Sequence, residues 1–565
     1  MILVEQQRWI DELVYARRAA AISAAIAARG KTKPPSEDGR GVSAFRRLAQ
    51  VAYAAGASDP ALMDEAFLAA QRALATDAAQ ALSQLAARHA VGNTDLARLL
   101  RERQDLDAEL ETRGKHLISA VARVPDQRDR DAEAKLRARI AAIEERLSVI
   151  QDTVAAEFPA FEELSRGTPL GIRDVQALLR PNEVLLQYLD LPSVGSVPEA
   201  AYVWAVTPKT ALWVKLAAGA EAIARAVATL RCGLDNQRWS TTSTPPCTTL
   251  LPADARRGDW LPFDLAAAHD LWKSLLGPLE TETAGKELLV VPAGALTTLP
   301  FSVLVTKQPK VAFPDTLEGY RQAAWLGTRQ AVTVLPSAGA LQALRKFARQ
   351  SMARHPYLGL GTPLLEGAGS ATAPASPAAL ARDRQLSPEV VASRGKIRTA
   401  RNDGAVARML SGGSADIATI RRLPPLPETA DELCDVGRRL SAPRNDILLG
   451  AHATEAGLKT MSENGRLADY RVLHFATHGA LSGELKGTAE PGLILTPPGK
   501  AASTADLERD DGYLSASELA SLKLAADWIV LSACNTAGAG SGKTDTLSGM
   551  ARAFFYAGGR SLLVS

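Results

Sequence analysis

The chain has few cysteines and no long apolar run, and each shortage excludes a class of protein. Its 565 residues include four cysteines with no Cys-x-x-Cys pair, namely Cys232, Cys247, Cys434 and Cys534. Scattered cysteines argue against a zinc site and a disulfide framework, and they fit a reducing compartment. No stretch of about 18 apolar residues could cross a membrane, and the first residues become charged too early for a signal peptide. The sequence therefore predicts a cytoplasmic protein.

An excess of charge of either sign is also absent. The chain has 65 Lys and Arg residues against 62 Asp and Glu residues, which gives a net charge of +3. This balance gives no overall reason to expect nucleic acid or an anionic membrane as a partner. With 46% hydrophobic and 22% charged residues the composition is that of a globular protein. Its length exceeds that of a single core, so we expect two or three domains.

Residues 1–92 are rich in Ala, Leu and Arg, and helix-breaking stretches interrupt them at 30–41 and 56–60. Segment 61–74 has the periodicity of an amphipathic helix. Paired helices of this kind predict a tetratricopeptide-like array, although no clean repeat of about 34 residues is found, and a plain helical bundle is the alternative. We expect these helices to bind a protein partner.

Residues 93–165 are expected to form a long helical hairpin that begins at an N-cap, Thr94. Apolar residues of its second helix alternate spacings of four and three, which is a heptad seam: Leu136, Ile140, Ile143, Leu147, Ile150 and Val154. Only a short break at Pro125 separates the two helices. An antiparallel hairpin is therefore the economical interpretation, with a parallel coiled-coil dimer as the alternative.

From Glu183 onward the periodicity becomes that of strands alternating with helices. Strands are expected at 184–189, 201–206, 211–216 and 288–292, and helices at 220–230 and 263–276. This alternation predicts an α/β fold, a mostly parallel sheet with flanking helices, over a third domain of residues 166–565. A segment rich in Ala, Ser, Pro and Gly at 365–396 interrupts it, and a surface insertion or an exposed processing loop would explain it.

Two short apolar runs near the C-terminus each lead to one reactive side chain. The run from Val472 to Ala476 leads to His478, and the run from Trp528 to Leu531 leads to Cys534. Such runs are typical of strands buried on both faces of a parallel sheet. Functional groups gather at the carboxyl ends of such strands, because the connecting loops open a crevice there. We therefore expect His478 and Cys534 to face each other from adjacent parallel strands.

These runs belong to motifs that resemble those of a known family. The motifs are HFATHG, DGYLSASELASLKL, IVLSACNTAG and GMARAFFYAGGRSLLVS, with LPPLPETA from Leu423 and PAGALTTLPF from Pro292 upstream. Together they are similar to the CHAT domain, a caspase-like cysteine peptidase domain that usually accompanies tetratricopeptide repeats. The resemblance implies a caspase-like fold and cleavage of protein or peptide substrates in a signalling or defence pathway. Because family members normally continue past the last strand, the chain is expected to be a fragment without the C-terminal end of the domain.

The resemblance also assigns roles to residues. A cysteine peptidase needs a thiolate, a proton-transfer group and donors for an oxyanion. Cys534, followed by a loop of small residues, matches the nucleophile, although most free cysteines are only small buried hydrophobes. His478 matches the proton-transfer residue, and the amides of Gly479 and Cys534 match the oxyanion hole. A non-catalytic interaction scaffold is the alternative function.

Two other motifs resemble sites but lack an essential feature. His474 and His478 could suggest a metal pair, but within a strand they would be roughly 13 Å apart, and the Glu of the zinc-peptidase motif is absent. We interpret His474 as a hydrogen-bonded core residue that supports the site. The stretch 538–544 resembles a phosphate loop, but Ala537 stands where the first Gly is required. No metal and no cofactor are expected.

Acidic residues near the nucleophile are candidates for a substrate pocket. Asp511 begins the DGYLSASEL segment, and Asp545 begins the helix after the nucleophile loop. The resemblance implies a charged pocket beside the nucleophile, so a carboxylate there would select Arg or Lys before the cut. For Asp545 the simpler explanation is that an acid in the first turn complements the helix dipole.

Overall fold

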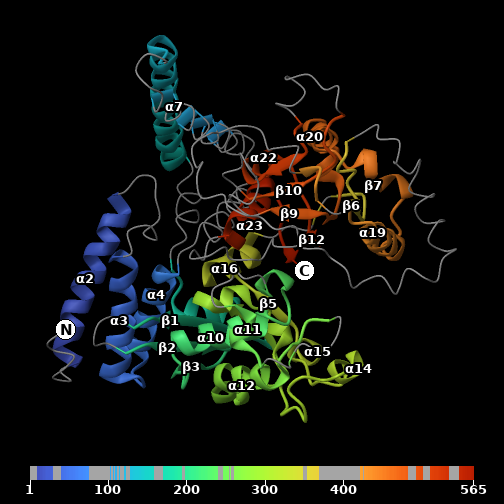
Figure 1. Ribbon diagram of the computed structural model, residues 1–565. Coiled ribbons are helices and arrows are strands. Elements are labelled where there is room, and N and C mark those ends of the chain that lie inside the picture. The colour runs from blue at the N-terminus through green and yellow to red at the C-terminus, as the bar shows by residue number, and fades with distance from the viewer. Residues whose placement is uncertain are drawn as a thin grey trace. The chain divides into compact units, whose positions relative to one another are not determined.

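The computed structural model consists of two compact units, Met1–Gln80 with Gly167–Lys346, and Ala81–Arg166 with Phe347–Ser565 (Figure 1). The residues described are 9–29, 40–74, parts of 99–121, 128–157, 169–193, 198–239, 246–252, 255, 260–347, 351, 353–367, 420–423, 425–480, 491–499, 510–532 and 546–564. Most of the insertion predicted at 365–396 lies outside these residues. The phosphate-loop-like stretch 538–544 lies outside them completely.

The first unit is built on a five-stranded sheet of order β3-β2-β1-β4-β5. The strands are β1 (Glu183–Leu191), β2 (Ala200–Val206), β3 (Ala211–Lys215), β4 (Glu287–Val291) and β5 (Val332–Val334). Strands β1, β2 and β3 pair antiparallel, whereas β4 is parallel to both β1 and β5. The four strands predicted in this region are all present.

Helices cover both faces of this sheet, because its central strands are apolar on both sides. On β1, Leu185 and Leu189 pack with one core and Leu186 and Tyr188 with the other, as the two-residue period of a strand requires. The first core includes helices α2 (Trp9–Arg29), α3 (Arg40–Gly56) and α4 (Pro60–Ala73), and the second includes α10 (Ala220–Arg231) and α12 (Leu265–Leu275). Shorter helices complete the unit: α9 (Ile172–Leu178), α11 (Cys247–Leu250), α13 (Glu280–Thr283), α14 (Leu317–Arg321), α15 (Leu326–Arg329) and α16 (Ala338–Phe347).

The N-terminal helices therefore share a core with this sheet, and the blue helices α3 and α4 lie beside β1 and β2 in Figure 1. The Trp204 side chain on β2 is fully buried, and its Nε1 donates to the carbonyl oxygen of Met63 on α4 at 3.3 Å. The compact units thus differ from the division predicted at residues 92 and 165. The physical reason is that the apolar faces of α3 and α4 are buried against strands more than 100 positions later in the chain.

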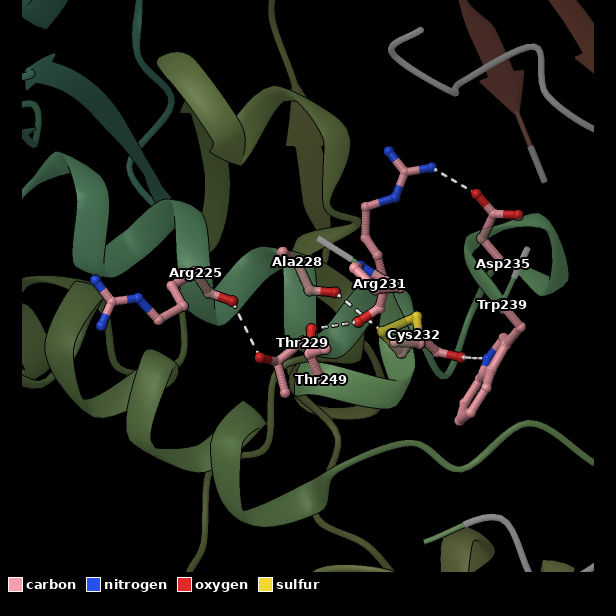
Figure 2. Close-up of a disulfide and its surroundings, with 10 residues drawn as sticks. Arg225, Ala228, Thr229, Arg231, Cys232, Asp235, Trp239 and Thr249 are labelled. Atoms are coloured by element: carbon pink, nitrogen blue, oxygen red, sulfur yellow. Dashed lines mark hydrogen bonds and ion pairs between the residues drawn. A yellow bond between two sulfur atoms is a disulfide. The ribbon is translucent and has the colours of Figure 1, made fainter. Parts of the chain in front are cut away.

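The first unit also contains a disulfide between Cys232 and Cys247, although the scattered cysteines argued against a disulfide framework. Cys232 caps the C-terminus of α10 and Cys247 begins α11, and their Cα atoms are 5.6 Å apart. Figure 2 shows the bond beside Trp239, whose Nε1 donates to the Cys232 carbonyl oxygen at 2.9 Å. The prediction considered only spacing along the chain, whereas the fold brings the ends of two helices together.

The second unit contains a parallel sheet of order β13-β12-β8-β6-β7. Its strands are β6 (Leu358–Gly361), β7 (Ile447–Leu449), β8 (Val472–Ala476), β12 (Trp528–Leu531) and β13 (Leu562–Val564). Helix α19 (Glu428–Arg439) packs on one face, and α20 (Glu455–Glu463), α22 (Ala516–Ser521) and α23 (Thr546–Ala557) pack on the other. The expected parallel sheet with flanking helices is present.

A small antiparallel sheet of order β11-β10-β9 follows β8 along the chain. It consists of β9 (His478–Ala480), β10 (Gly492–Ile494) and β11 (Tyr513–Ser515). Its apolar side chains Ala480, Ile494 and Tyr513 bury Ile420, which precedes α19, and Leu365, which follows β6. This small core therefore joins β9 to the segment that follows β6 and to the segment that precedes α19.

The helical hairpin of the second unit is antiparallel, as the economical interpretation predicted. Arg139 and Arg146 of helix α7 (Arg130–Glu157) pair with Glu109 and Glu102, so positions later in α7 meet positions earlier in its partner. On α7 the seam residues are the buried or half-buried ones, whereas most of the others are exposed. No helix among the described residues is both long and apolar enough to cross a membrane.

Candidate catalytic site

The strands that precede His478 and Cys534 are neighbours in the parallel sheet. Strand β8 pairs with β12 so that Phe475 faces Leu531, and the amide of Ser532 donates to the Phe475 carbonyl oxygen at 2.9 Å. Both strands are buried runs of the predicted kind, and they point in the same direction. Their carboxyl ends consequently reach the same edge of the sheet, which is the edge where ligands bind in open α/β sheets.

His478 lies just beyond this edge, where the chain passes from one sheet to the other. It begins β9 and pairs with Ile494, while Gly479 pairs with Leu493. Thr477 between the two sheets is fully buried, and its hydroxyl donates to the Ile494 carbonyl oxygen. The backbone of His478 and Gly479 is therefore held by the small sheet, and the His478 side chain is partly exposed.

Cys534 and Asp545 lie outside the described residues, so their predicted roles remain predictions. Ser532, two positions before Cys534, is the last described residue after β12 and is half-buried. The structure thus brings His478 and the segment that leads to Cys534 to one edge, and it places Gly479 beside His478.

Asp511 lies in the turn before β11. Its Oδ1 accepts a hydrogen bond from the Tyr513 amide at 2.9 Å, and its own amide donates to the buried Glu455 at 3.1 Å. Tyr513 faces Ile494, which also faces His478, so Asp511 lies near the far strand of the small sheet. Its carboxylate therefore supports this turn, and its predicted role in a substrate pocket is untested.

The loop after β6 contributes a second feature to the same edge. Thr362, which follows β6, has a positive φ of 48°, a backbone conformation that costs a residue with a side chain about 1–3 kcal/mol. Its amide donates to the hydroxyl of Thr429 on α19 at 3.1 Å, which holds it in place. Because β7 and β8 flank β6 on opposite sides, the connections diverge here, as at the ligand-binding crevices of open α/β sheets.

His474 is the buried, hydrogen-bonded residue that the sequence predicted. Its side chain is almost fully buried, its Nδ1 lies 3.0 Å from the Tyr357 hydroxyl, and its Nε2 lies 3.1 Å from the Ser532 hydroxyl. The Nε2 is also 3.2 Å from the Glu432 carboxylate, which accepts from Ser532. Burial lowers the pKa of His474, and Glu432 partly opposes this effect. The imidazole is therefore neutral at neutral pH.

Sequence reasoning missed the three partners of His474. Ser532 stands inside the IVLSACNTAG motif and Glu432 follows the LPPLPETA motif, so both lie beside recognised signals, whereas nothing in the sequence singles out Tyr357. The pairing could not be found from the sequence because Glu432 and Ser532 are 100 positions apart.

Acidic side chains also gather under the small sheet. Glu455 is almost fully buried and pairs with Lys459, and burial raises its pKa to about 8. Lys459 also binds Glu518, which caps α22 together with Ser515. Within the described parts of the chain no group of three or more His, Cys, Asp or Glu side chains could hold a metal ion.

Comparison with known proteins identifies the family. None of the curated proteins matches the chain. The family model of the CHAT domain matches residues 265–565, a region that contains β8, β12, His478 and Cys534. The match covers more than half of the chain, and the protein therefore belongs to the CHAT domain family.

Proposed function

We propose that the protein is a caspase-like cysteine endopeptidase in which Cys534 attacks the substrate carbonyl carbon and His478 transfers the proton to the leaving group. The observation that carries this proposal is the parallel pairing of β8 with β12, in which Phe475 faces Leu531. Because both strands end at one edge, the segments that hold His478 and Cys534 begin side by side.

The chemistry assigned to each group follows from its type. A thiolate adds to the peptide carbonyl, and the resulting oxyanion requires donors, for which the amides of Gly479 and Cys534 are the candidates. His478 protonates the departing amine, and water later releases the acyl group from the sulfur. A partly exposed imidazole at the sheet edge suits this role, because histidine is the side chain that most often transfers protons in enzymes.

An activity-based thiol probe tests the proposal directly. We expect the probe to label the wild-type protein at Cys534, and Cys534→Ala to lose both labelling and peptide cleavage. Cys434→Ala is the matched control, because burial raises the pKa of the Cys434 thiol and so disfavours its reactive thiolate. Cleavage that persists in Cys534→Ala, or labelling only at Cys434, would refute the assignment.

The second candidate function is an interaction scaffold that does not cleave peptides. The helices α2–α4 favour it, since α2 exposes Ile10, Val14 and Tyr15, which offer apolar contacts to a protein partner. The two functions are compatible, with these helices sensing a partner that controls the peptidase in a signalling or defence pathway. A partner captured equally by wild type and Cys534→Ala, without any cleavage of peptides by either, would favour the scaffold.

The substrate residue before the cut is proposed to be Arg or Lys. Asp511 and Asp545 are the candidate pocket carboxylates, although the hydrogen bond from Tyr513 already gives Asp511 a role in its turn. Peptides that differ only in Arg, Lys, Asp or Asn at that position would measure the preference. Loss of the Arg preference in Asp511→Asn or Asp545→Asn would identify the pocket, and preferential cleavage after Asp would exclude it.

A cytoplasmic location is retained only as a proposal. The Cys232–Cys247 bond removes one ground for it, because disulfides persist mainly in oxidising compartments. Localisation of the tagged chain, with the redox state of Cys232 measured in the same cells, would decide between the compartments.

A further inference from the structure

Four side chains from four elements meet under the strand end that leads to Cys534. Tyr357 precedes β6, His474 lies on β8, Ser532 follows β12 and Glu432 lies on α19. We call them the relay cluster. Tyr357 and His474 are almost fully buried, whereas the Glu432 side chain is 41% exposed. The cluster therefore has a buried end, formed by Tyr357 and His474, and a partly exposed end, formed by Glu432.

The hydrogen-bond pattern of the cluster determines where each proton lies. A serine hydroxyl has one hydrogen. The Ser532 hydroxyl donates it in a hydrogen bond to the Glu432 carboxylate, which can only accept. Ser532 must therefore accept from His474, so the Nε2 of the imidazole carries the hydrogen. The Nδ1 is then an acceptor, and it receives a hydrogen bond from the Tyr357 hydroxyl, whose pKa is raised by burial.

This tautomer excludes one function for the cluster. A Ser-His-acid arrangement could suggest a serine nucleophile, but a base must accept the proton of the serine, and the Nε2 of His474 already carries one. The carboxylate also lies on the Nε2 side of the ring, whereas a triad acid binds Nδ1. Ser532 is therefore held in place and is not activated.

We propose that the relay cluster is a positioning device for the nucleophile loop, in which His474 and Glu432 fix Ser532 and thereby the start of the segment that carries Cys534. The catalytic role of this positioning rests on the proposed function, in which Cys534 is the nucleophile. Ser532 is held at three points: its amide binds Phe475, its hydroxyl accepts from His474 and the same hydroxyl donates to Glu432. Since Cys534 is two positions later in the chain, these bonds fix the residue from which its segment starts.

The cluster also ties that position to α19. Among the described residues, the titratable groups that face His474 are Tyr357 and Glu432, and Cys434 on α19 acts on Tyr357 in turn. Glu432 is the one member on a helix and binds both Ser532 and His474. A displacement of α19 would therefore break both bonds of Glu432 and remove one of the three bonds that hold Ser532, while the strand pairing would remain.

The test measures the reactivity of the Cys534 thiol, so it does not require a peptide substrate. Iodoacetamide alkylation is followed between pH 5 and pH 9, and the alkylated Cys534 and Cys434 peptides are quantified separately. In Ser532→Ala we expect the rate-against-pH profile of Cys534 to shift, with that of Cys434 unchanged, and in Tyr357→Phe we expect the profile of Cys534 to shift as well. Ser532→Thr, which keeps the hydroxyl, should restore the wild-type profile. Asp435→Asn, on the same helix but paired with Arg438 at the surface, is the control and should leave Cys534 unchanged.

NMR of the His474 ring nitrogens gives a second readout, which decides the test if one of the variants fails to fold. The nitrogen chemical shifts of His474 in the wild type should report the Nε2–H tautomer, and Tyr357→Phe should keep it, because Ser532 and Glu432 determine where that hydrogen lies. An unchanged Cys534 profile in folded Ser532→Ala and in Tyr357→Phe would overturn the proposal, as would a wild-type Nδ1–H tautomer. If peptides are cleaved, kcat should fall roughly 10-fold in Ser532→Ala with KM unchanged. If no peptide is cleaved, the proposed function fails while the alkylation profile still decides the positioning role.

Discussion

Phe475 and Leu531 lie opposite each other on adjacent parallel strands, and the amide that follows Leu531 donates to the Phe475 carbonyl oxygen at 2.9 Å. This register places the fourth residue of β8 level with the last residue of β12. Both strands end at one edge of the sheet. His478 is three positions after Phe475, and Cys534 is three positions after Leu531. The equal offset is the geometric basis of the proposed dyad.

Cys534→Ala should abolish peptide cleavage and change the stability little. A nucleophile must be reachable by its substrate, so on the proposed function the loss of its sulfur creates little cavity and the free energy of unfolding should fall by less than about 2 kcal/mol. Peptide cleavage and thermal unfolding of the same preparation check this. A loss of stability as large as that of a core truncation, with or without loss of activity, would show that the residue is structural.

Removal of the Cys232–Cys247 disulfide should destabilise the first unit. The bond closes a loop of 15 positions, and in the chain-entropy account such a loop is worth about 3 kcal/mol. The pair Cys232→Ala and Cys247→Ala should lower the melting temperature and make it insensitive to reductant. A wild-type melting temperature that does not change on full reduction would contradict this, and Cys434→Ala serves as the control.

Glu455 should make the second unit less stable as the pH rises. Burial raises its pKa from 4.5 to about 8, so the folded state favours the protonated carboxyl. The contribution to stability is therefore complete below about pH 4.5 and is lost as the pH rises toward 8. Thermal unfolding at pH 5 and pH 8 should show a smaller pH dependence in Glu455→Gln than in the wild type. Glu463→Gln, at the exposed end of the same helix, should keep the wild-type dependence.

Gly361→Ala should destabilise the junction of β6 and β8. A Cβ at this position would lie 2.6 Å from the Ala476 carbonyl oxygen and 2.6 Å from a methyl group of Leu433. Overpacking of this kind costs about 1–3 kcal/mol. Gly339→Ala is the control, because its nearest neighbour would be 3.6 Å away, and denaturant unfolding compares the two. Equal unfolding free energies for both variants would show that the strands can move apart without cost.

Much of the second unit was predictable from short-range patterns. The apolar runs before His478 and Cys534 have the length and composition of strands buried on both faces, and they form β8 and β12. The heptad positions of α7 are all buried or half-buried, since a seam of period 3.5 lies on one side of a helix. His474 was predicted as a core residue because a strand places it too far from His478 to share a metal ion.

Tertiary structure alone decided which distant residues meet. The disulfide joins the ends of two helices, and no pattern of spacing indicates that α10 and α11 bring Cys232 within 5.6 Å of Cys247. The N-terminal helices were predicted as a separate array, because periodicity shows which face of a helix is apolar but not what covers it; in the fold, β1 and β2 cover it. The relay cluster is of the same kind. Tyr357 is 117 positions and Ser532 is 58 positions from His474, and Glu432 is 100 positions from Ser532. Only the strand order and the place of α19 bring these side chains together.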